Sequence, residues 1–266
     1  MKRIVPGLLI AGLWLLLLLI GSAPMFNFVV LIIILVGADE YIRMAFSHII
    51  SSVDRFLLDG IIAVPACVAC FSPYHSALLP AFILSFAFVV SYFLYRYRQL
   101  DACYSLLSRV VMGLFYVGIL GAHLILLRAL PEGASWILIA TAITASSDSG
   151  AYFAGKRFGK KKLCPNISPN KTVEGAVGGL LAALIASIVF ATLLLPSFSY
   201  VSLFVVTILL TGFGIAGDLT ESIIKRGTGT KDSGRCLAGH GGILDRVDSL
   251  LFVAPVLYYF LIFSVV

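Results

Sequence analysis

Long apolar segments follow one another along almost the whole chain, and this feature constrains the fold more than any other. Of 266 residues, 60% are hydrophobic and 12% are charged, against roughly 45–50% and 25% in an ordinary soluble domain. A membrane-spanning helix needs about 20 mostly apolar residues. Nine segments come near that length: Val5–Ala23, Phe26–Phe46, Leu57–Phe71, Ala77–Tyr95, Leu106–Leu127, Ala134–Ala154, Val173–Pro196, Tyr200–Gly217 and Leu250–Val266. The sequence therefore predicts an all-α, polytopic integral membrane helix bundle with about nine transmembrane helices.

The basic residues predict how these helices are oriented. Lys and Arg near the ends of membrane spans stay on the cytoplasmic side. With the N-terminus inside, the nine-span arrangement puts every one of the 19 Lys and Arg residues in an inside segment except Arg128. We therefore expect a cytoplasmic N-terminus and an outside C-terminus. The net charge of +6 then serves as a topology signal and as a complement to phosphate, and we expect no nucleic-acid partner.

Two long inside loops, residues 155–172 and 218–249, hold most of the remaining charge. In the first loop, Asn170 or Thr172 is placed to cap the next helix, which would leave the first amides of that helix and Lys171 free to bind a phosphate. Topology or anionic lipid headgroups explain the same basic loop equally well. Asp148 lies near the inner end of an apolar segment, where an acid is costly unless it faces a polar cavity. It is therefore either the partner of a nearby Lys or Arg or a ligand of a metal or substrate.

The second loop places acids at helical spacing around a glycine-rich connector. If the eighth segment continues as a helix, four polar residues share one face: Asp218, Glu221, Ser222 and Lys225. Asp245 and Asp248 are likewise three residues apart where the last segment begins. Carboxylates that leave positions open for water and phosphate are typical magnesium ligands in nucleotide sites. Glycines let the backbone approach an anion closely and adopt a positive φ. The pattern favours a phosphate and metal site over a merely solvated charged face.

The same residues carry a family resemblance. The second loop contains Ser222-x-x-Lys225-Arg226, then Lys231-Asp232-x-Gly234, then His240-Gly241-Gly242-x-x-Asp245-Arg246-x-Asp248. Upstream lie Asp148-Ser149-Gly150-Ala151-Tyr152, Phe158-Gly159-Lys160, Ser168-Pro169-Asn170-Lys171-Thr172 and Gly217-Asp218-Leu219-Thr220-Glu221-Ser222. These motifs closely resemble the signature of the phosphatidate cytidylyltransferase (CDP-diacylglycerol synthase) family. Ala238 departs from it, since the family usually has Pro or Gly there, and this affects the rigidity of the turn rather than the chemistry.

The resemblance implies a nucleotidyltransferase of phospholipid biosynthesis that converts CTP and phosphatidate into CDP-diacylglycerol and pyrophosphate. It implies a catalytic set of Asp218, Asp245, Asp248, Lys225 and Lys231. It implies that Mg²⁺, with a second metal ion left open, is bound by Asp218, Glu221, Asp245, Asp248 and Asp148. It implies a substrate-binding set of Lys171, Ser168, Thr172, Ser222, Arg226, Asp232, His240, Gly241, Gly242 and Arg246. For His240, a phosphate contact and a structural hydrogen bond within the turn are both kept as alternatives.

The apolar segments and the distribution of basic residues, together with this resemblance, predict how the chain is organised and where it works. We expect a single membrane-embedded domain over residues 1–266, with 1–130 as N-terminal helices that scaffold a lipid groove and 131–266 as catalytic helices and cytoplasmic loops. The active site would face the cytoplasm at a bacterial inner membrane, in contact with membrane lipid, and a homodimer is left open.

Two other functions compete with this expectation. A CTP-dependent lipid kinase of the polyprenol type would use a similar metal site but would attack the γ-phosphorus of CTP. An ion-coupled transporter would need acids along an ion path through the membrane. In this sequence the acids crowd at one rim instead, which counts against a transporter.

Overall fold

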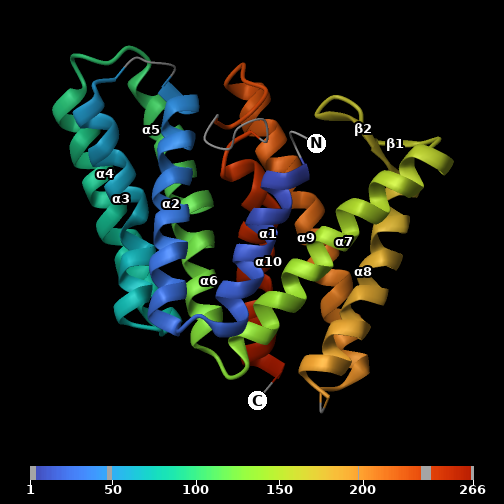
Figure 1. Ribbon diagram of the computed structural model, residues 1–266. Coiled ribbons are helices and arrows are strands. Elements are labelled where there is room, and N and C mark those ends of the chain that lie inside the picture. Colours follow the sequence, from blue (N-terminus) through green and yellow to red (C-terminus); the bar gives the residue numbers. More distant parts are fainter. Residues whose placement is uncertain (1–3, 47–49, 197, 235–240, 265–266) are drawn as a thin grey trace. The chain divides into compact units, whose positions relative to one another are not determined.

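The structure is a computed structural model that describes residues 4–46, 50–196, 198–234 and 241–264. The described chain is helical apart from one short hairpin and its connections (Figure 1). The helices are α1 (Ile4–Ile20), α2 (Ala23–Phe46), α3 (Ser52–Phe71), α4 (Leu78–Arg96), α5 (Cys103–Gly113), α6 (Leu120–Ala129), α7 (Gly133–Phe158), α8 (Val173–Leu194), α9 (Tyr200–Gly227) and α10 (Leu244–Ser264). A 3-10 turn, η1 (His75–Ala77), precedes α4, and a π-helical segment, η2 (Leu114–Ile119), joins α5 to α6.

Six of the described helical segments are long and apolar enough to cross a membrane: Ala23–Phe46, His75–Arg96, Cys103–Ala129, Val173–Leu194, Tyr200–Gly227 and Leu244–Phe263. All of the segments predicted from the sequence overlap a helix of the structure. The prediction of an all-α, polytopic membrane protein is therefore confirmed. The number of crossings and the cytoplasmic N-terminus stay predictions.

The chain forms two compact units, each of which is made of two stretches of sequence. The first consists of Met1–Leu130 and Gly227–Arg246, and the second of Pro131–Arg226 and Val247–Val266. That the whole chain acts as one domain stays a prediction.

In the first unit, α2 packs against α3 and α6, and α3 also packs against α4. Phe26 and Ile42 of α2 and Leu58 of α3 are completely buried in this core. At Gly118 of η2, an added Cβ would lie 2.3 Å from the carbonyl oxygen of Ile62 in α3. Because such a contact is too short for any side chain, glycine is what allows these two segments to approach so closely.

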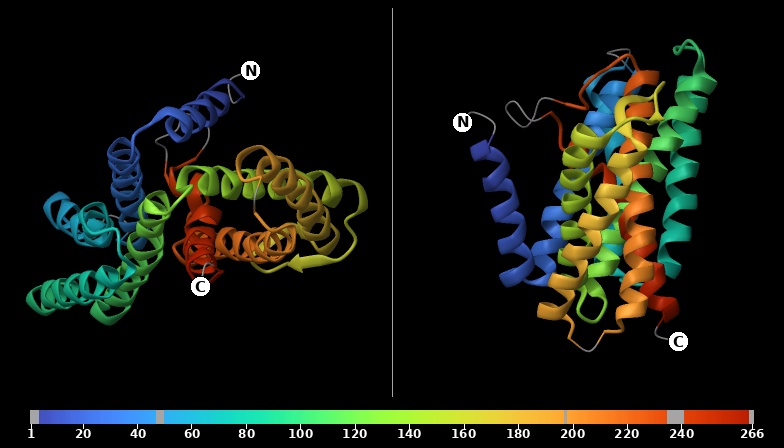
Figure 2. Two further views of the ribbon diagram at one scale, coloured as in Figure 1. Left: turned by 90° about the horizontal axis from the view of Figure 1, so that it is seen from below. Right: turned by 90° about the vertical axis from the view of Figure 1, so that its right-hand side faces the viewer.

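In the second unit, α7 and α8 lie side by side in every view (Figures 1 and 2). Small residues line their contact. A Cβ on Gly178 of α8 would lie 2.2 Å from the Cβ of Ala154, and one on Gly150 of α7 would lie 2.6 Å from the Cβ of Ala182. Helices that pack through small residues in a membrane gain van der Waals contact without needing a hydrophobic driving force.

A short antiparallel hairpin connects α7 to α8, in residues that the sequence analysis treats as a loop. Its strands are β1 (Lys162–Cys164) and β2 (Ser168–Thr172), with Lys162 opposite Thr172 and Cys164 opposite Ser168. Thr172 ends the hairpin and caps α8, because its hydroxyl accepts a hydrogen bond from the backbone N–H of Gly175 (3.1 Å). Of the two caps expected from the sequence, Thr172 is the one that the structure contains.

Candidate functional site

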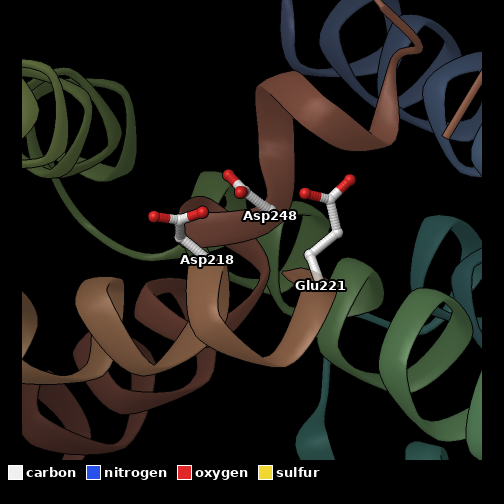
Figure 3. A group of neighbouring side chains, drawn as sticks. All are labelled: Asp218, Glu221 and Asp248. Carbon is white, nitrogen blue, oxygen red and sulfur yellow. The ribbon is translucent and has the colours of Figure 1, made fainter. Parts of the chain in front are cut away.

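Three carboxylates meet where α9 lies against α10. Asp218 and Glu221 belong to α9 and Asp248 to α10, and one ligand oxygen of each lies within 4.8 Å of the other two. Figure 3 shows Asp218 and Glu221 on one helix, with Asp248 from the other helix between them. Glu221 is buried, at 1% exposure. Carboxylates held this close together in a protein interior repel one another, so their charge must be offset by a cation or by a proton on one of them.

The sequence explains this arrangement in two steps. First, α9 continues as a helix through Gly227, so Asp218 and Glu221, three residues apart, lie on one face, as predicted. Second, Gly217 lets α10 approach: an added Cβ would lie 2.6 Å from the carbonyl oxygen of Asp248 and 3.2 Å from the Cα of Ser249. The backbone of Asp248 is therefore in direct contact with the turn of α9 that carries Asp218.

Two lysines form ion pairs with this acid group. Lys171, at the end of β2, pairs with Asp218, and Lys225 pairs with Glu221 one helical turn away (2.6 Å). Asp248 has no ion pair among the described residues, and its carboxylate accepts a hydrogen bond from the backbone N–H of Ser249 (2.6 Å). The two lysines therefore neutralise two of the three carboxylates, and the third has no paired lysine.

A cavity of about 290 Å³ lies beside the acids, near the lower end of the range for ligand pockets. Its polar lining comes from α7 and from the hairpin, and includes Asp148, Ser168, Asn170, Lys171 and Thr172. Lys171 both lines this cavity and pairs with Asp218. The cavity and the acid group are therefore adjoining parts of one polar site.

The acid group suits a hard divalent cation. Carboxylate oxygens are the protein ligands that Mg²⁺ prefers, usually one or two of them with the remaining positions left for water and phosphate. Asp248, which has no ion pair among the described residues, keeps carboxylate lone pairs that could coordinate the cation beside its hydrogen bond from Ser249. Asp218 and Glu221 would share a cation with their lysines or exchange the lysines for it. The identity of these residues as magnesium ligands stays a prediction.

The other predicted residues are distributed over both units. The second unit also holds Asp148, Ser168 and Thr172 at the cavity and Ser222, Lys225 and Arg226 on α9. The first unit holds Lys231, Asp232, Gly241, Gly242, Asp245 and Arg246. His240 and the Ala238 departure lie outside the described residues. Gly241 has a φ of +79°, so the predicted need for a left-handed glycine is met at this position.

Asp245 is not part of the group of three acids, although it is a predicted metal ligand. Its Oδ2 accepts hydrogen bonds from the backbone N–H of Gly242 (2.7 Å), the backbone N–H of Ser233 (3.1 Å) and the hydroxyl of Ser233 (2.8 Å). The Asp245 carboxylate therefore links Ser233 to Gly242 through hydrogen bonds. Its metal-binding role stays a prediction.

Among the acids that the sequence does not single out, Glu40 and Glu174 bind backbone N–H groups of segments that lead into helices or strands. Glu40 of α2 accepts hydrogen bonds from the backbone of Ile243 and Leu244. Glu174 of α8 accepts the backbone N–H groups of Lys160 and Lys161 and so fixes the start of the hairpin. Glu40 could have been noticed for the same reason as Asp148, because each is an acid inside a predicted membrane span. Glu174 gave no signal beyond its place near a helix start.

Comparison with known proteins places the chain in a family. The model of the "Cytidylyltransferase family" matches residues 1–264. The phosphatidate cytidylyltransferase of Bacillus subtilis is 46% identical over 153 residues, which cover 57% of each chain. Proteins of the same name from Staphylococcus saprophyticus and Staphylococcus aureus are 46% and 45% identical over 167 and 169 residues, which cover 63% and 64% of this chain and 62% of theirs. The matched stretches thus span about 57–62% of the length of these relatives.

The family match extends over both units and includes every residue of the acid group and of the cavity beside it. It also includes the apolar helices, so the membrane architecture and the polar site fall within one match. The chain belongs to the cytidylyltransferase family.

Proposed function

We propose that this chain is a phosphatidate cytidylyltransferase, which makes CDP-diacylglycerol and pyrophosphate from CTP and phosphatidate. The observation that carries the proposal is the polar site of the second unit, in which Lys171 joins a cavity to the group formed by Asp218, Glu221 and Asp248. The acid group lies on α9 and α10, both long and apolar enough to cross a membrane, so we expect a lipid substrate to reach it from the bilayer. The names of the relatives from three bacteria support the same reaction.

The reaction needs positioning and charge neutralisation more than it needs a strong base. A phosphate oxygen of phosphatidate attacks the α-phosphorus of CTP, a new P–O bond forms there, and the bond to the β-phosphate oxygen breaks. Pyrophosphate leaves with the electron pair of the broken bond. Because the nucleophile is already an anion, its approach to a triphosphate must be favoured by cations and fixed donors.

The lysines of the site are placed for this task. Lys171 is half-buried at the cavity wall and its ammonium group donates to Asp218. A triphosphate in the cavity would offer the same ammonium group a second anion. Thr172 caps α8 beside it, and the first turn of a helix provides amide donors and a positive dipole end that favour phosphate.

We also propose Mg²⁺ as the cofactor, held by Asp218, Glu221 and Asp248. When bound, the ion would neutralise triphosphate charge and stabilise the pyrophosphate leaving group. Removal of divalent cations with EDTA is expected to abolish product formation, and added Mg²⁺ is expected to restore it. Full activity in EDTA would contradict the cofactor proposal.

The chain is an integral membrane protein, and we further propose a bacterial inner membrane with the active site on the cytoplasmic face. This location fits a soluble nucleotide and the predicted distribution of basic residues. Single cysteines introduced at Lys161 and at Arg128 into a cysteine-free variant would test it in intact cells. A membrane-impermeant thiol reagent should label the cysteine at 128 and not the one at 161, and the reverse pattern would overturn the orientation. The homodimer also stays a prediction, which sedimentation in detergent would test.

The reaction itself is tested with the detergent-solubilised full-length chain, CTP, dioleoyl phosphatidate and Mg²⁺. CDP-diacylglycerol and pyrophosphate should appear in equal amounts, and both should require phosphatidate. Pyrophosphate release without a nucleotide-linked lipid would contradict the proposed function.

A further inference from the structure

A buried carboxylate of the first unit holds the start of α10, and no part of the proposed mechanism uses it. Glu40 of α2 is 3% exposed. Its Oε1 accepts the backbone N–H of Ile243 (3.0 Å), and its Oε2 accepts the backbone N–H of Leu244 (3.0 Å). The hydroxyl of Ser233 lies 3.3 Å from the same Oε2. We call the group of Glu40, Ser233, Ile243 and Leu244 the Glu40 clasp.

The clasp is a helix cap supplied by another helix. The first N–H groups of an α-helix have no acceptor within that helix, and negative charge at this end is favoured by the helix dipole. α10 begins at Leu244. The hydrogen-bonded residues lie 203 and 204 positions apart in the sequence. The contact therefore fixes where α10 starts relative to α2.

Two glycines show that the chain is shaped around this carboxylate. A Cβ on Gly234 would lie 2.2 Å from Oε1 of Glu40, and a Cβ on Gly242 would lie 2.4 Å from Oε2. Neither position has room for a side chain while Glu40 stays in place. The backbone on both sides of residues 235–240 therefore passes directly against the Glu40 carboxylate.

Asp245 strengthens the same arrangement from within α10. It accepts hydrogen bonds from Gly242 and from both donors of Ser233, so the Ser233 hydroxyl lies between the carboxylates of Glu40 and Asp245. The first turn of α10 is thus held by two acids. Asp248 follows Leu244 by four residues, or about one turn, on the same helix.

We propose that Glu40 is a positioning residue for the proposed reaction: through the clasp it sets the start of α10 and thereby the placement of the Asp248 carboxylate. The inference rests on the proposed function for its activity readout. Glu40 has no proposed contact with substrate, so its loss should affect turnover more than nucleotide binding.

The decisive variant is Glu40→Gln, which keeps the length and shape of the side chain. Each oxygen of Glu40 accepts a different backbone N–H, and an amide has only one oxygen. In either orientation of the amide, one of these two N–H groups at the start of α10 therefore faces an NH₂ group. Asp39→Asn is the matched control, since Asp39 is the preceding residue and pairs with Arg43 and Arg55 outside the clasp.

Two measurements on the full-length protein in detergent test the proposal. For Glu40→Gln we expect kcat to fall by about 10- to 100-fold with the KM for CTP changed less than about twofold, because a buried unsatisfied donor disturbs the turn that leads to Asp248. We also expect amide hydrogen exchange in residues 241–248 to become at least about tenfold faster, with exchange in α8 unchanged. Asp39→Asn should behave like the wild-type protein in both measurements.

The possible results separate this inference from the proposed function. Unchanged exchange in residues 241–248 would overturn the clasp, and faster exchange with unchanged kcat would overturn its positioning role. A raised KM for CTP at normal kcat would instead make Glu40 a nucleotide contact and would also overturn it. A wild-type protein that forms no CDP-diacylglycerol would contradict the proposed function, while the exchange comparison would still test the clasp.

Ser233→Ala keeps the inference testable if Glu40→Gln does not fold. It removes the hydroxyl between the two carboxylates and leaves both backbone contacts of Glu40 in place. We expect a fall in kcat of about three- to tenfold at unchanged KM. Wild-type kcat in Ser233→Ala would overturn the positioning role.

Discussion

Gly217 of α9 is in contact with the backbone of Asp248 of α10, and an added Cβ at Gly217 would lie 2.6 Å from the Asp248 carbonyl oxygen. This oxygen belongs to the backbone, which cannot rotate out of the way as the end of a flexible side chain can. Because Asp218 is the next residue of α9, this contact helps to determine how far apart the carboxylates of Asp218 and Asp248 lie. The proposed metal site thus depends on one glycine that carries no functional group.

The first prediction concerns this contact. Gly217→Ala should push α9 and α10 apart and lower kcat by about 10- to 100-fold, since small displacements of reacting groups are costly. Gly212→Ala is the control on the same helix, because a Cβ there would have no atom within 4 Å. Steady-state kinetics of both variants check the prediction. Equal activities of the two variants would show that the close approach at Gly217 is not needed.

The second prediction concerns the acids themselves. Asp218→Asn and Asp248→Asn should each lower product formation at least about 100-fold, because the amide keeps the shape of the side chain and loses the charge that attracts a divalent cation. Both proteins should still insert and fold, as judged by monodisperse elution in detergent. Asp101→Asn, in an exposed connection, serves as the control. Near-normal turnover of either variant at saturating Mg²⁺ would remove that residue from the site.

The third prediction concerns Lys171, which lies at the cavity wall and pairs with Asp218. Lys171→Met should raise the KM for CTP by about tenfold or more, because a charge-assisted contact to phosphate is lost. Lys161→Met, an exposed lysine of the same connection, should leave the KM unchanged. The finding that Lys161→Met has the larger effect would mean that the nucleotide binds at the hairpin surface instead of the cavity.

Much of this site could be predicted because it depends on local periodicity. Asp218 and Glu221 share a face of α9 as their spacing requires, and each predicted span overlaps a helix because apolar length is a strong signal. The hairpin was not predicted, since strands of three and five residues rich in Lys, Pro and Asn show no alternation of apolar and polar positions.

The contacts of Glu40 and Asp245 could not be predicted from spacing alone. Asp245 and Asp248 are three residues apart, like Asp218 and Glu221, yet the Asp245 carboxylate is bound by Ser233 and Gly242. Glu40 finds its donors more than 200 residues further along the chain. Such partners are set by tertiary packing, about which a single sequence carries no periodic signal.

The fourth prediction concerns the cap of α8. Thr172→Ala should destabilise the protein by about 1 kcal/mol, because the N–H of Gly175 loses its acceptor at a buried helix start. Thr172→Ser keeps the hydroxyl and should retain most of the stability. Thermal unfolding in one detergent, followed by circular dichroism, compares the two variants. An equal loss of stability in both would indicate that the methyl group of Thr172 matters and the cap does not.

In the proposed reaction the α-phosphate of CTP ends up in the lipid, whereas a kinase would transfer the γ-phosphate. The most direct measurement incubates membranes containing the full-length chain with phosphatidate, Mg²⁺ and CTP labelled with ³²P at either the α or the γ position, and then extracts the lipid. Cytidylyl transfer puts label in the lipid from the α position and label in soluble pyrophosphate from the γ position. Lipid labelled only from the γ position would contradict cytidylyl transfer and would indicate a CTP-dependent lipid kinase.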